Sequence, residues 1–588
     1  MSVMKGTNRL VGGWLIAAIT SVCSSGFLLF GYDQGVMSGV VISKYWLAQM
    51  DHPSSLMVGT MTALYDVGAV FGAIGAAFTG EQLGRKRTLL LGTSALIVGT
   101  ILMASSYERI QFMVSRICTG IGIGYITSVT PVYQAEISAA AQRGWQVCCQ
   151  LSTMLGGLMI AYWINYGFFF VHSSAQWRFP LAFQLVFAIY IMLVAPWLPD
   201  TPRWLMRHRS PEEGLAVLAR LRGRDEKDRV VQMEKNEIMD AIAIEEREEG
   251  SWADLFRSNG ISANKRFYLA LGIQFMQQMS GINIVTYYAP TLFSTSLNMT
   301  QEMSILMGCF LQLWYIIASF LTWYTIDRVG RRLLFISMAL GMCLVLVAEA
   351  IAVNRIEAAD YHSTSAGVAA VFFVFAFEAC FTWGWMATVW VYPPEILPLK
   401  IRAKGAALAA GADFLGNFLV VEVTPDGVKN LGWKFYIVWA VLNLANAIIV
   451  WLFYPETGGQ PLEAIDTLFA DKEQRRRAST LHDVYDDDVD DEAAIVDATR
   501  ADLKKRGLLS RLQWSIVRKA DRQVKAYKRA SRLRRISETE TATAVSDTTT
   551  ARGRGEDNEE EEDRNARARA RAQGCKVHAD QREVVVQK

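Results

Sequence analysis

Three glutamines in one apolar stretch, Gln274, Gln277 and Gln278, have the spacing of a polar stripe on a helix. Together with Gly281 they occupy positions i, i+3, i+4 and i+7, which lie on one face of an α-helix. A carboxamide both donates and accepts, so it can hydrogen-bond a neutral polyhydroxyl molecule without the cost of desolvating a charge. In an apolar surrounding these amides must face protein or a cavity, where they either bind a ligand or join helices.

Asp33 and Arg116 are charged residues inside two other apolar stretches. At a helical rise of about 1.5 Å per residue, both lie roughly 7–9 Å from the same end of their segments, so they can meet. An unpaired charge at this depth is unfavourable, and we therefore expect an ion pair. Arginine stays protonated, whereas the aspartate can take up a proton when its partner moves away. The pair is either a structural ion pair or a site that loads a proton.

The elements that position these residues are apolar stretches of about 20 residues, each long enough to cross a bilayer as a helix. We expect a first group of six spans at 14–41, 57–79, 88–105, 110–134, 146–168 and 179–198. We expect a second group of six at 267–292, 303–326, 333–353, 366–392, 405–424 and 434–454. Asn283 lies off the glutamine face of its span and joins it only if the helix breaks near Ser280-Gly281.

This pattern predicts an all-α membrane protein with twelve transmembrane helices in two pseudo-symmetric six-helix bundles, at 1–198 and 266–470. Between them, 199–265 is charged and predicts short linker helices in the cytoplasm. The tail at 471–588 is rich in charges of both signs, cannot bury a core and is predicted to be disordered. No nucleophile–base set, phosphate-binding loop or metal-ligand cluster occurs in the sequence, so we expect no enzyme activity, cofactor, metal or nucleic-acid partner.

Basic residues are concentrated in alternate loops between the spans. Arg85-Lys-Arg87 follows the second span, Arg331-Arg332 follows the eighth and Lys400 to Lys404 follow the tenth. The positive-inside rule places these loops, both termini and the linker in the cytoplasm, and we expect the membrane to be the plasma membrane. The loop between spans seven and eight then faces outward, and it carries the glycosylation sequon Asn298-Met-Thr.

Two motifs recur six spans apart. Gly84-Arg-Lys-Arg after span two corresponds to Gly330-Arg-Arg after span eight. Glu136 and Arg143 after span four correspond to Glu395 and Arg402 after span ten, with the same seven-residue separation. Such internal symmetry indicates two halves that arose by duplication.

Further motifs are spread between Gly26 and Phe469. In chain order they include Gly31-Tyr-Asp33-Gln, Arg116-xxx-Gly120-x-Gly122-x-Gly124, Pro131-Val-Tyr-Gln-Ala-Glu136, Arg143-Gly144, Pro199-Asp-Thr-Pro-Arg203-Trp204, Gln277-Gln278-Met-Ser-Gly281-Ile-Asn283, Asp327-Arg-Val-Gly-Arg331-Arg332, Glu395-xx-Pro398-xxx-Arg402 and Pro455-Glu-Thr457. This series resembles the sugar porter family of the major facilitator superfamily, and in particular its fungal branch, which includes glycerol/proton symporters. The resemblance implies an alternating-access fold with a central site, and a secondary active transporter of a sugar or polyol.

The resemblance also implies roles for individual residues. Substrate contacts map to Gln150, Gln277, Gln278, Asn283, Trp390 and Asn417, and outer-gate positions map to Tyr287 and Tyr288. We add Asp413 to the substrate contacts, where the family usually has asparagine. Tyr315 and Val389 also depart from the family pattern, which puts a glucose-type contact set in doubt.

In the resembled family, an aspartate at position 33 marks proton symporters, so Asp33 with Arg116 predicts proton coupling. Asp66, Glu349 and Glu378 are further acids inside the spans, and each is either satisfied by neighbours or part of a second polar site. Three alternatives remain open: a facilitative uniporter, a nutrient sensor that signals through the tail, and a quinate-type carrier of organic acids.

Charged residues at the cytoplasmic ends of the spans are expected to form conformational latches, which hold the two halves together when the inner side is closed. They are Glu81, Arg85, Glu136, Arg143, Asp327, Arg331, Glu395 and Arg402. Gln82 stands where the family usually has arginine, which predicts a weaker latch in the first half.

Overall fold

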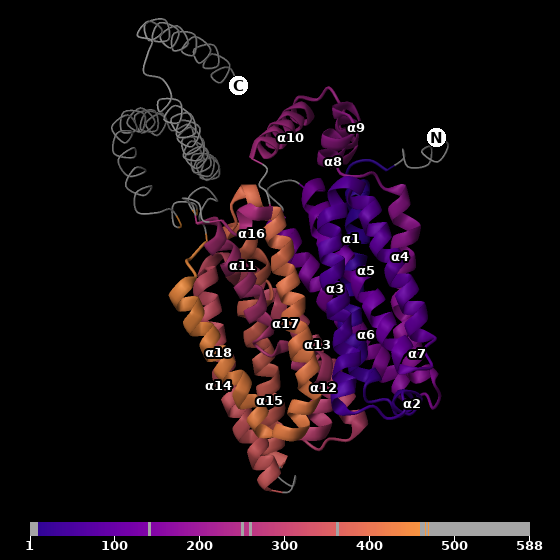
Figure 1. The fold of residues 1–588 in the computed structure, drawn as a ribbon, viewed down its shortest axis with the longest axis vertical. Helices are drawn as coiled ribbons and strands as arrows, with labels where there is room; N and C mark the ends of the chain where they lie inside the picture. The colour runs from indigo at the N-terminus through magenta and orange to yellow at the C-terminus, as the bar shows by residue number, and fades with distance from the viewer. Residues whose placement is uncertain are drawn as a thin grey trace, which may run out of the picture. The chain divides into compact units, whose positions relative to one another are not determined.

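The computed structural model describes residues 10–138, 143–248, 252–257, 262–359, 364–458, 465 and 469. In this part of the chain every regular element is a helix (Figure 1). Ten helical segments of the described chain are long and apolar enough to cross a membrane. The prediction of an all-α membrane protein is confirmed. The tail at 471–588 lies outside the described residues.

The first half of the bundle begins with a helix that is held at the linker by a hydrogen bond of 2.7 Å from the Gly12 N–H to the Arg220 carbonyl. Its helices are α1 (Gly13–Val40), α2 (Lys44–Gln49), α3 (Ser55–Leu83), α4 (Arg85–Ala104), α5 (Arg109–Ile137), α6 (Arg143–Phe169) and α7 (Ala175–Val194). All but the short α2 run the length of the bundle, and α5 packs against both α3 and α4.

Glycines of the Gly120-x-Gly-x-Gly motif explain how α5 approaches two neighbours at once. Cβ atoms added at Gly120 and Gly124 would lie 2.0 and 2.2 Å from backbone oxygens of α3. A Cβ added at Gly122 would lie 2.6 Å from the Leu96 Cβ on α4. Small residues at such positions let membrane helices pack backbone to backbone. The motif therefore fixes the position of α5, and with it the position of Arg116.

The linker forms a group of short helices at one end of the bundle, which we call the linker end (Figure 1). Its elements are α8 (Pro202–His208), α9 (Pro211–Arg222), α10 (Arg229–Glu248) and η5 (Trp252–Leu255), and η4 (Ala195–Trp197) precedes it at the end of the first bundle. Thr201 and Ser210 cap α8 and α9 by accepting backbone N–H bonds, and each cap is followed by proline at the first helical position. These start signals explain why the charged interval forms helices here.

The second half contains α11 (Ala263–Gln278), α12 (Ile282–Ser296), α13 (Gln301–Val329), α14 (Arg331–Ala358), α15 (Thr364–Phe381), η6 (Thr382–Met386), α16 (Thr388–Ile396), η7 (Leu399–Ile401), α17 (Arg402–Leu431) and α18 (Trp433–Phe453). Two of its crossings are interrupted, one between α11 and α12 and one at the π-helical η6. With each interrupted pair taken as one crossing, both halves of the described chain have six crossings.

The helices are longer than the predicted spans. α3 continues to Leu83 and α17 to Leu431, whereas hydropathy predicted ends at 79 and 424. The extra turns carry Glu81 on α3 and Asp426 and Lys429 on α17. Hydropathy detects only the part of a helix that lies in the hydrocarbon core. The polar turns of α3 and α17 beyond the bilayer are therefore not included in the predicted spans.

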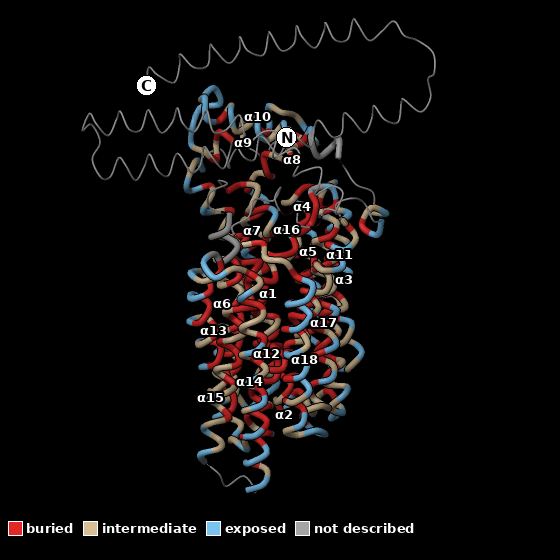
Figure 2. The backbone as a smooth tube through the Cα atoms, turned by 90° about the vertical axis from the view of Figure 1, so that its left-hand side faces the viewer, coloured by how far each residue is buried: buried red, intermediate tan, exposed pale blue. Residues whose placement is uncertain are grey.

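Apolar side chains cover the outside of the bundle as well as filling its interior. Large apolar side chains such as Leu344 and Val368 are exposed, 71% and 67% respectively, on the outside of the bundle. Buried residues run along the inner faces of the helices (Figure 2), and they include Asp33, Arg116 and Glu378, each 0% exposed. Charged groups inside a membrane bundle mark functional positions by default.

Candidate functional site

The interruption between α11 and α12 brings the amides of both segments together. Gly281 has φ +88°, in the left-handed region, and its N–H donates to the Gln278 carbonyl at 3.0 Å. A Cβ there would lie 3.2 Å from the Trp439 ring, so glycine is required both by the backbone and by the space. The helix therefore breaks at Gly281, as was required for Asn283 to join the glutamine face.

A chain of hydrogen bonds connects four of the predicted substrate residues. Gln278 Nε2 donates to Asp413 Oδ1 at 2.6 Å, and Asn283 Nδ2 donates to Gln278 Oε1. Asn283 Nδ2 also donates to Asn417 Oδ1 at 2.6 Å. Asn417 Nδ2 in turn donates to Asp66 Oδ1 at 2.8 Å. Both amide hydrogens of Asn283 can thus be used within the chain, and a carboxylate stands at each end.

Other buried amides retain unused polar atoms. Gln277 Nε2 donates to the Trp385 carbonyl at 3.1 Å, while its Oε1 has no partner among the described residues. In the same part of the chain, Gln150 Nε2 and Gln274 Oε1 also lack partners. Buried polar atoms are normally paired, so an unpaired set indicates a place for water or a ligand. Donors and acceptors together suit a hydroxyl, which is both.

The π-helical segment η6 explains the partner of Gln277. A π-helix shifts the backbone register, so carbonyls such as that of Trp385 become available to side chains. Trp390 follows on α16 and is half-buried against the core of the second half. The predicted substrate tryptophan thus lies on the crossing that contacts Gln277.

The two predicted gate tyrosines are buried on α12. Tyr287 Oη lies 3.4 Å from Asn417 Nδ2, which places it beside the amide chain. Tyr288 Oη donates to the Val421 carbonyl at 3.3 Å, and its φ of −125° departs from helical geometry. Both rings therefore pack α12 against α17 beside the amide chain. We call the end of the bundle away from the linker the distal end.

Asp33 and Arg116 form the expected ion pair. Arg116 Nη1 lies 3.3 and 3.4 Å from the two carboxylate oxygens of Asp33, and both side chains are fully buried. Asp33 lies seven residues before the end of α1 at Val40, and Arg116 seven residues after the start of α5 at Arg109. The two groups are thus at equal depth, about 10 Å from the distal helix ends at 1.5 Å per residue.

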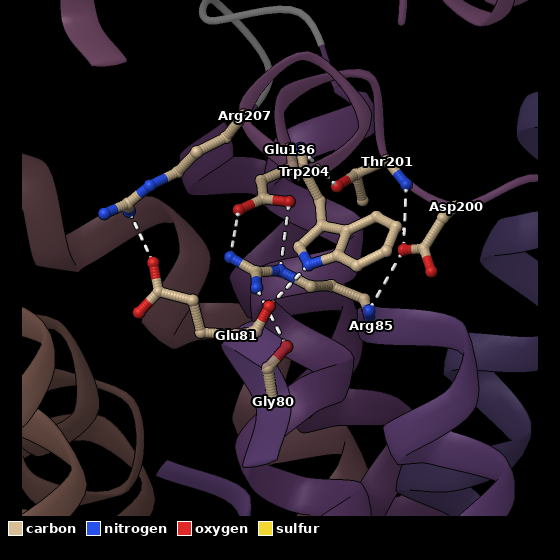
Figure 3. Close-up of polar contacts among 8 residues, drawn as sticks. All are labelled: Gly80, Glu81, Arg85, Glu136, Asp200, Thr201, Trp204 and Arg207. Atoms are coloured by element: carbon tan, nitrogen blue, oxygen red, sulfur yellow. Dashed lines mark hydrogen bonds and ion pairs between the residues drawn. The ribbon is translucent and has the colours of Figure 1, made fainter. Parts of the chain in front are cut away.

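At the linker end of the first half, Arg85 is the centre of a polar cluster (Figure 3). Its Nη2 and Nε lie 2.8 and 3.3 Å from the carboxylate oxygens of Glu136, and its Nη1 donates to the Gly80 carbonyl at 3.1 Å. Asp200 Oδ1 accepts from the backbone N–H groups of Arg85 and Thr201, each at 3.0 Å. Burial raises the pKa of the Asp200 carboxyl, and these hydrogen bonds oppose the shift.

Glu81 belongs to the same cluster but has a different partner. Its carboxylate forms an ion pair with Arg207 of α8, and its carbonyl accepts from Trp204 Nε1 at 2.6 Å (Figure 3). These contacts attach the linker to α3, and the bond from the Arg85 N–H to Asp200 attaches it to α4. In this structure Arg85 thus pairs with Glu136, and Glu81 pairs with the linker.

The second half repeats this arrangement around Arg331. Arg331 Nη2 lies 3.0 Å from Glu395 Oε1, and Thr457 Oγ1 donates to Glu395 Oε2 at 2.6 Å. Glu456 accepts from the backbone N–H groups of Arg331 and Arg332 at 2.8 and 2.9 Å, as Asp200 does for Arg85. Glu456 and Asp200 are therefore symmetry-related helix caps that the motif comparison did not single out.

Four predicted residues remain, namely Arg402, Asn298, Arg143 and Asp327. Arg402 Nε donates to the Leu397 carbonyl at 3.1 Å at the start of α17. Asn298 is exposed with φ +52° in the loop before α13. The side chains of Arg143 and Asp327 lie outside the described part of the chain.

Two acids are more prominent in the structure than the sequence predicted. Asp66, 1% exposed, is joined to the substrate amides, and Glu378 is buried with both carboxylate oxygens unpartnered among the described residues. The sequence signalled only that both acids lie inside spans. Helical periodicity within one span does not tell which distant helix a side chain meets, so the partner of Asp66 could not be predicted.

The fold and the buried polar site define a polytopic helical membrane protein of the major facilitator type. A family model described as sugar (and other) transporter matches residues 18–469. The MFS-type transporter oryC of Aspergillus oryzae is 40% identical over 467 residues, which cover 78% of this chain and 86% of oryC. The chain belongs to the sugar transporter family.

Two further similarities agree with this membership. The sugar transporter STL1 of Saccharomyces cerevisiae is 33% identical over 475 residues, which cover 78% of this chain and 82% of STL1. The proton:xylose symporter XylE, in a structure bound to 6-bromo-6-deoxy-D-glucose, matches with a TM-score of 0.64 and 24% identity. That match covers 77% of this chain and 99% of XylE, and it shows the shared fold.

Proposed function

We propose that the protein is a proton-coupled transporter that takes up a neutral sugar or polyol by alternating access. The observation that carries the proposal is the amide chain Gln278–Asn283–Asn417, built on the helix break at Gly281 and placed where the two halves meet. The relative STL1, a sugar transporter, supports the substrate class. The two bundles at 1–198 and 266–470 act as the halves that rock around this site.

Amides and carboxylates favour a neutral ligand over an organic acid. A substrate carboxylate at this site would meet Asp413 and Asp66, which stand at the two ends of the amide chain. Like charges in a buried site repel strongly, and Arg116 is already paired with Asp33. Hydroxyl groups of a neutral ligand, by contrast, can donate to Gln277 Oε1 or accept from Gln150 Nε2, which lack partners among the described residues.

Proton coupling is assigned to Asp33. Its ion pair with Arg116 is fully buried, so protonation from the distal side would neutralise the aspartate and free the arginine. Release of the proton on the linker side would restore the pair and reset the carrier. A facilitative uniporter would keep the ion pair throughout the transport cycle.

The linker end is placed in the cytoplasm of a plasma-membrane protein, together with both termini. Support comes from the basic clusters around Arg85 and Arg331, which lie at the ends of helices on that side. The exposed loop with Asn298 then faces the exterior.

The test is uptake in a host that lacks its own sugar transporters. Radiolabelled glucose, xylose, maltose and glycerol are supplied in turn, with and without a protonophore. The proposal expects concentrative uptake of at least one compound and its collapse with the protonophore. Uptake of none of them would contradict the proposal, and so would uptake of labelled quinate alone when quinate is supplied as a fifth compound.

Removal of residues 471–588 separates transport from sensing. If the protein is a transporter, the shortened chain retains uptake, because the site and the helices that carry it lie before position 471. A nutrient sensor would instead lose its signal with the tail.

A further inference from the structure

The amide chain of the second half ends on a carboxylate of the first half. Asp66 on α3 is buried, and its Oδ1 accepts from Asn417 at 2.8 Å. Its second oxygen, Oδ2, has no hydrogen-bond partner among the described residues. A buried carboxylate oxygen without a partner is unfavourable in a membrane bundle. Asp66 is therefore able to take a second partner without losing a contact first.

One turn of α3 connects Asp66 with the proposed proton site. Arg116 Nη2 donates to the Thr62 carbonyl at 3.0 Å, and its guanidinium lies 4.7 Å from the centre of the Tyr65 ring. Thr62 precedes Asp66 by four residues, so in an α-helix the Thr62 carbonyl is also the acceptor for the Asp66 backbone N–H. Arg116 thus contacts the turn that carries Asp66 and interacts electrostatically with its carboxylate.

Charged and titratable side chains surround Asp66 on several elements. They are Asp33 on α1, Tyr65 on α3, Arg116 on α5, Tyr287 and Tyr288 on α12, and Asp413 on α17. Arg116 is the cation of this set. Arg116 already contacts α3 at the Thr62 carbonyl. When Arg116 leaves Asp33, the acid of this set that α3 offers to it is Asp66.

We propose that Asp66 is a positioning residue that passes the protonation state of Asp33 to the substrate amides. This inference rests on the proposed proton coupling at Asp33. When Asp33 binds a proton, Arg116 turns to the free oxygen of Asp66. The new pair draws the Asp66 carboxylate towards α5, so Asn417 loses its acceptor and its amide becomes available to the substrate. The proton stays on Asp33 until its release on the linker side, where Arg116 returns and the Asp66–Asn417 bond re-forms.

The exchange also changes the contact between the two halves. The Asp66–Asn417 bond joins α3 to α17, whereas an Asp66–Arg116 pair lies within the first half. Protonation would therefore replace a bond between halves by a bond within one half. In a proton-coupled carrier, binding of the proton must be coupled to the separation of the two halves, and this exchange of partners supplies such a coupling.

The test uses Asp66→Asn in the full-length chain, reconstituted in proteoliposomes with radiolabelled glucose, xylose and glycerol assayed in parallel. Asparagine keeps an oxygen that can accept from Asn417 but cannot form an ion pair with Arg116. We expect the variant to retain exchange at equal concentrations, and its accumulation is compared with its own exchange rate. Accumulation under an inward proton gradient should fall about fivefold or more, because coupling between two binding sites usually changes affinity by at least about that factor. The dependence of accumulation on pH should become weaker. Asp66→Ser gives a second neutral variant if the asparagine chain does not fold.

Matched controls separate the possible results. Glu349→Gln neutralises another buried carboxyl, on α14 and 2% exposed, and should leave accumulation and its pH profile unchanged. If Asp33→Asn abolishes accumulation while the Asp66 variants keep both accumulation and the pH profile, the inference is wrong and proton coupling stands. If Asp33→Asn itself keeps accumulation, the proposed coupling is wrong, and the inference is wrong with it.

Discussion

Asn417 Nδ2 donates to Asp66 Oδ1 at 2.8 Å, and this bond joins residues 351 positions apart in the chain. It connects α17 of the second half with α3 of the first half, and it continues an amide chain that begins at Asp413. The same residues thus form a candidate substrate site and a contact between the halves. Changes at the site should therefore affect both substrate affinity and the movement of the halves.

Gln278→Ala should weaken substrate binding. The change removes the donor to Asp413 Oδ1 and one of the two acceptors of Asn283, which keeps its bond to Asn417. An unsatisfied buried polar group costs about 1–3 kcal/mol, so KM should rise about 5- to 150-fold. Uptake kinetics and surface abundance measure the effect. Gln184→Leu removes a buried amide of α7 and should leave KM unchanged, whereas an equal rise in both variants would point to a general loss of packing.

The glutamine stripe could be predicted from spacing, because periodicity tells which residues of one helix share a face. The place of Asn283 depended on a break at Gly281, which the sequence permitted but did not require. At the break Trp439 of α18 packs against the glycine, and this contact comes from a distant helix. The pairing of Asp33 with Arg116 was predictable because two buried charges of opposite sign had equal depth.

The partners of Asp66 and Glu136 were harder to predict. Asp66 meets Asn417 through the packing of α3 on α17, which no local pattern encodes. Glu136 belongs to the predicted latch, and the structure adds that its carboxylate pairs with Arg85 of the same half. Motif repetition identifies equivalent residues in the two halves, but it does not tell which of them touch in a given conformation.

Gly281→Ala should slow transport. At φ +88° a side chain costs about 1–2 kcal/mol, and the added Cβ would press on the Trp439 ring at 3.2 Å. The break should shift or straighten, so both KM and maximal rate should worsen. Gly411→Ala on α17 is the matched control, since a Cβ there meets nothing within 4 Å. Equal uptake by the two variants would argue against a role for the break.

Glu136→Gln should lower the turnover rate more than the affinity. The change removes the charge that holds Arg85 at the linker end, away from the substrate amides. Charge-assisted hydrogen bonds contribute about 1.5–3 kcal/mol. We therefore expect kcat to fall about tenfold or more, while KM stays near its wild-type value. Arg224→Ala breaks an exposed ion pair of the linker with Asp228 and should change neither constant. A rise in KM without a change in kcat for Glu136→Gln would contradict the latch role.

Asn298→Gln should remove a glycan in a fungal host. The residue is exposed in the loop between α12 and α13, which the proposed orientation places outside the cell. The wild-type chain should lose mass on treatment with an endoglycosidase, and the variant should not. Thr300→Ser keeps the sequon and the helix cap, so it should remain glycosylated. A wild-type chain without any glycan, combined with a protease-accessible linker on intact cells, would reverse the orientation.

The most direct test of the account is proton-coupled accumulation by Asp33→Asn. Asparagine fits the same space beside Arg116 but cannot bind and release a proton. The account predicts that this variant still exchanges labelled substrate across the membrane, yet no longer accumulates it above the external concentration or alkalinises the medium when substrate is added. If Asp33→Asn accumulated substrate and alkalinised the medium as the wild-type protein does, proton coupling through the Asp33–Arg116 pair would be contradicted.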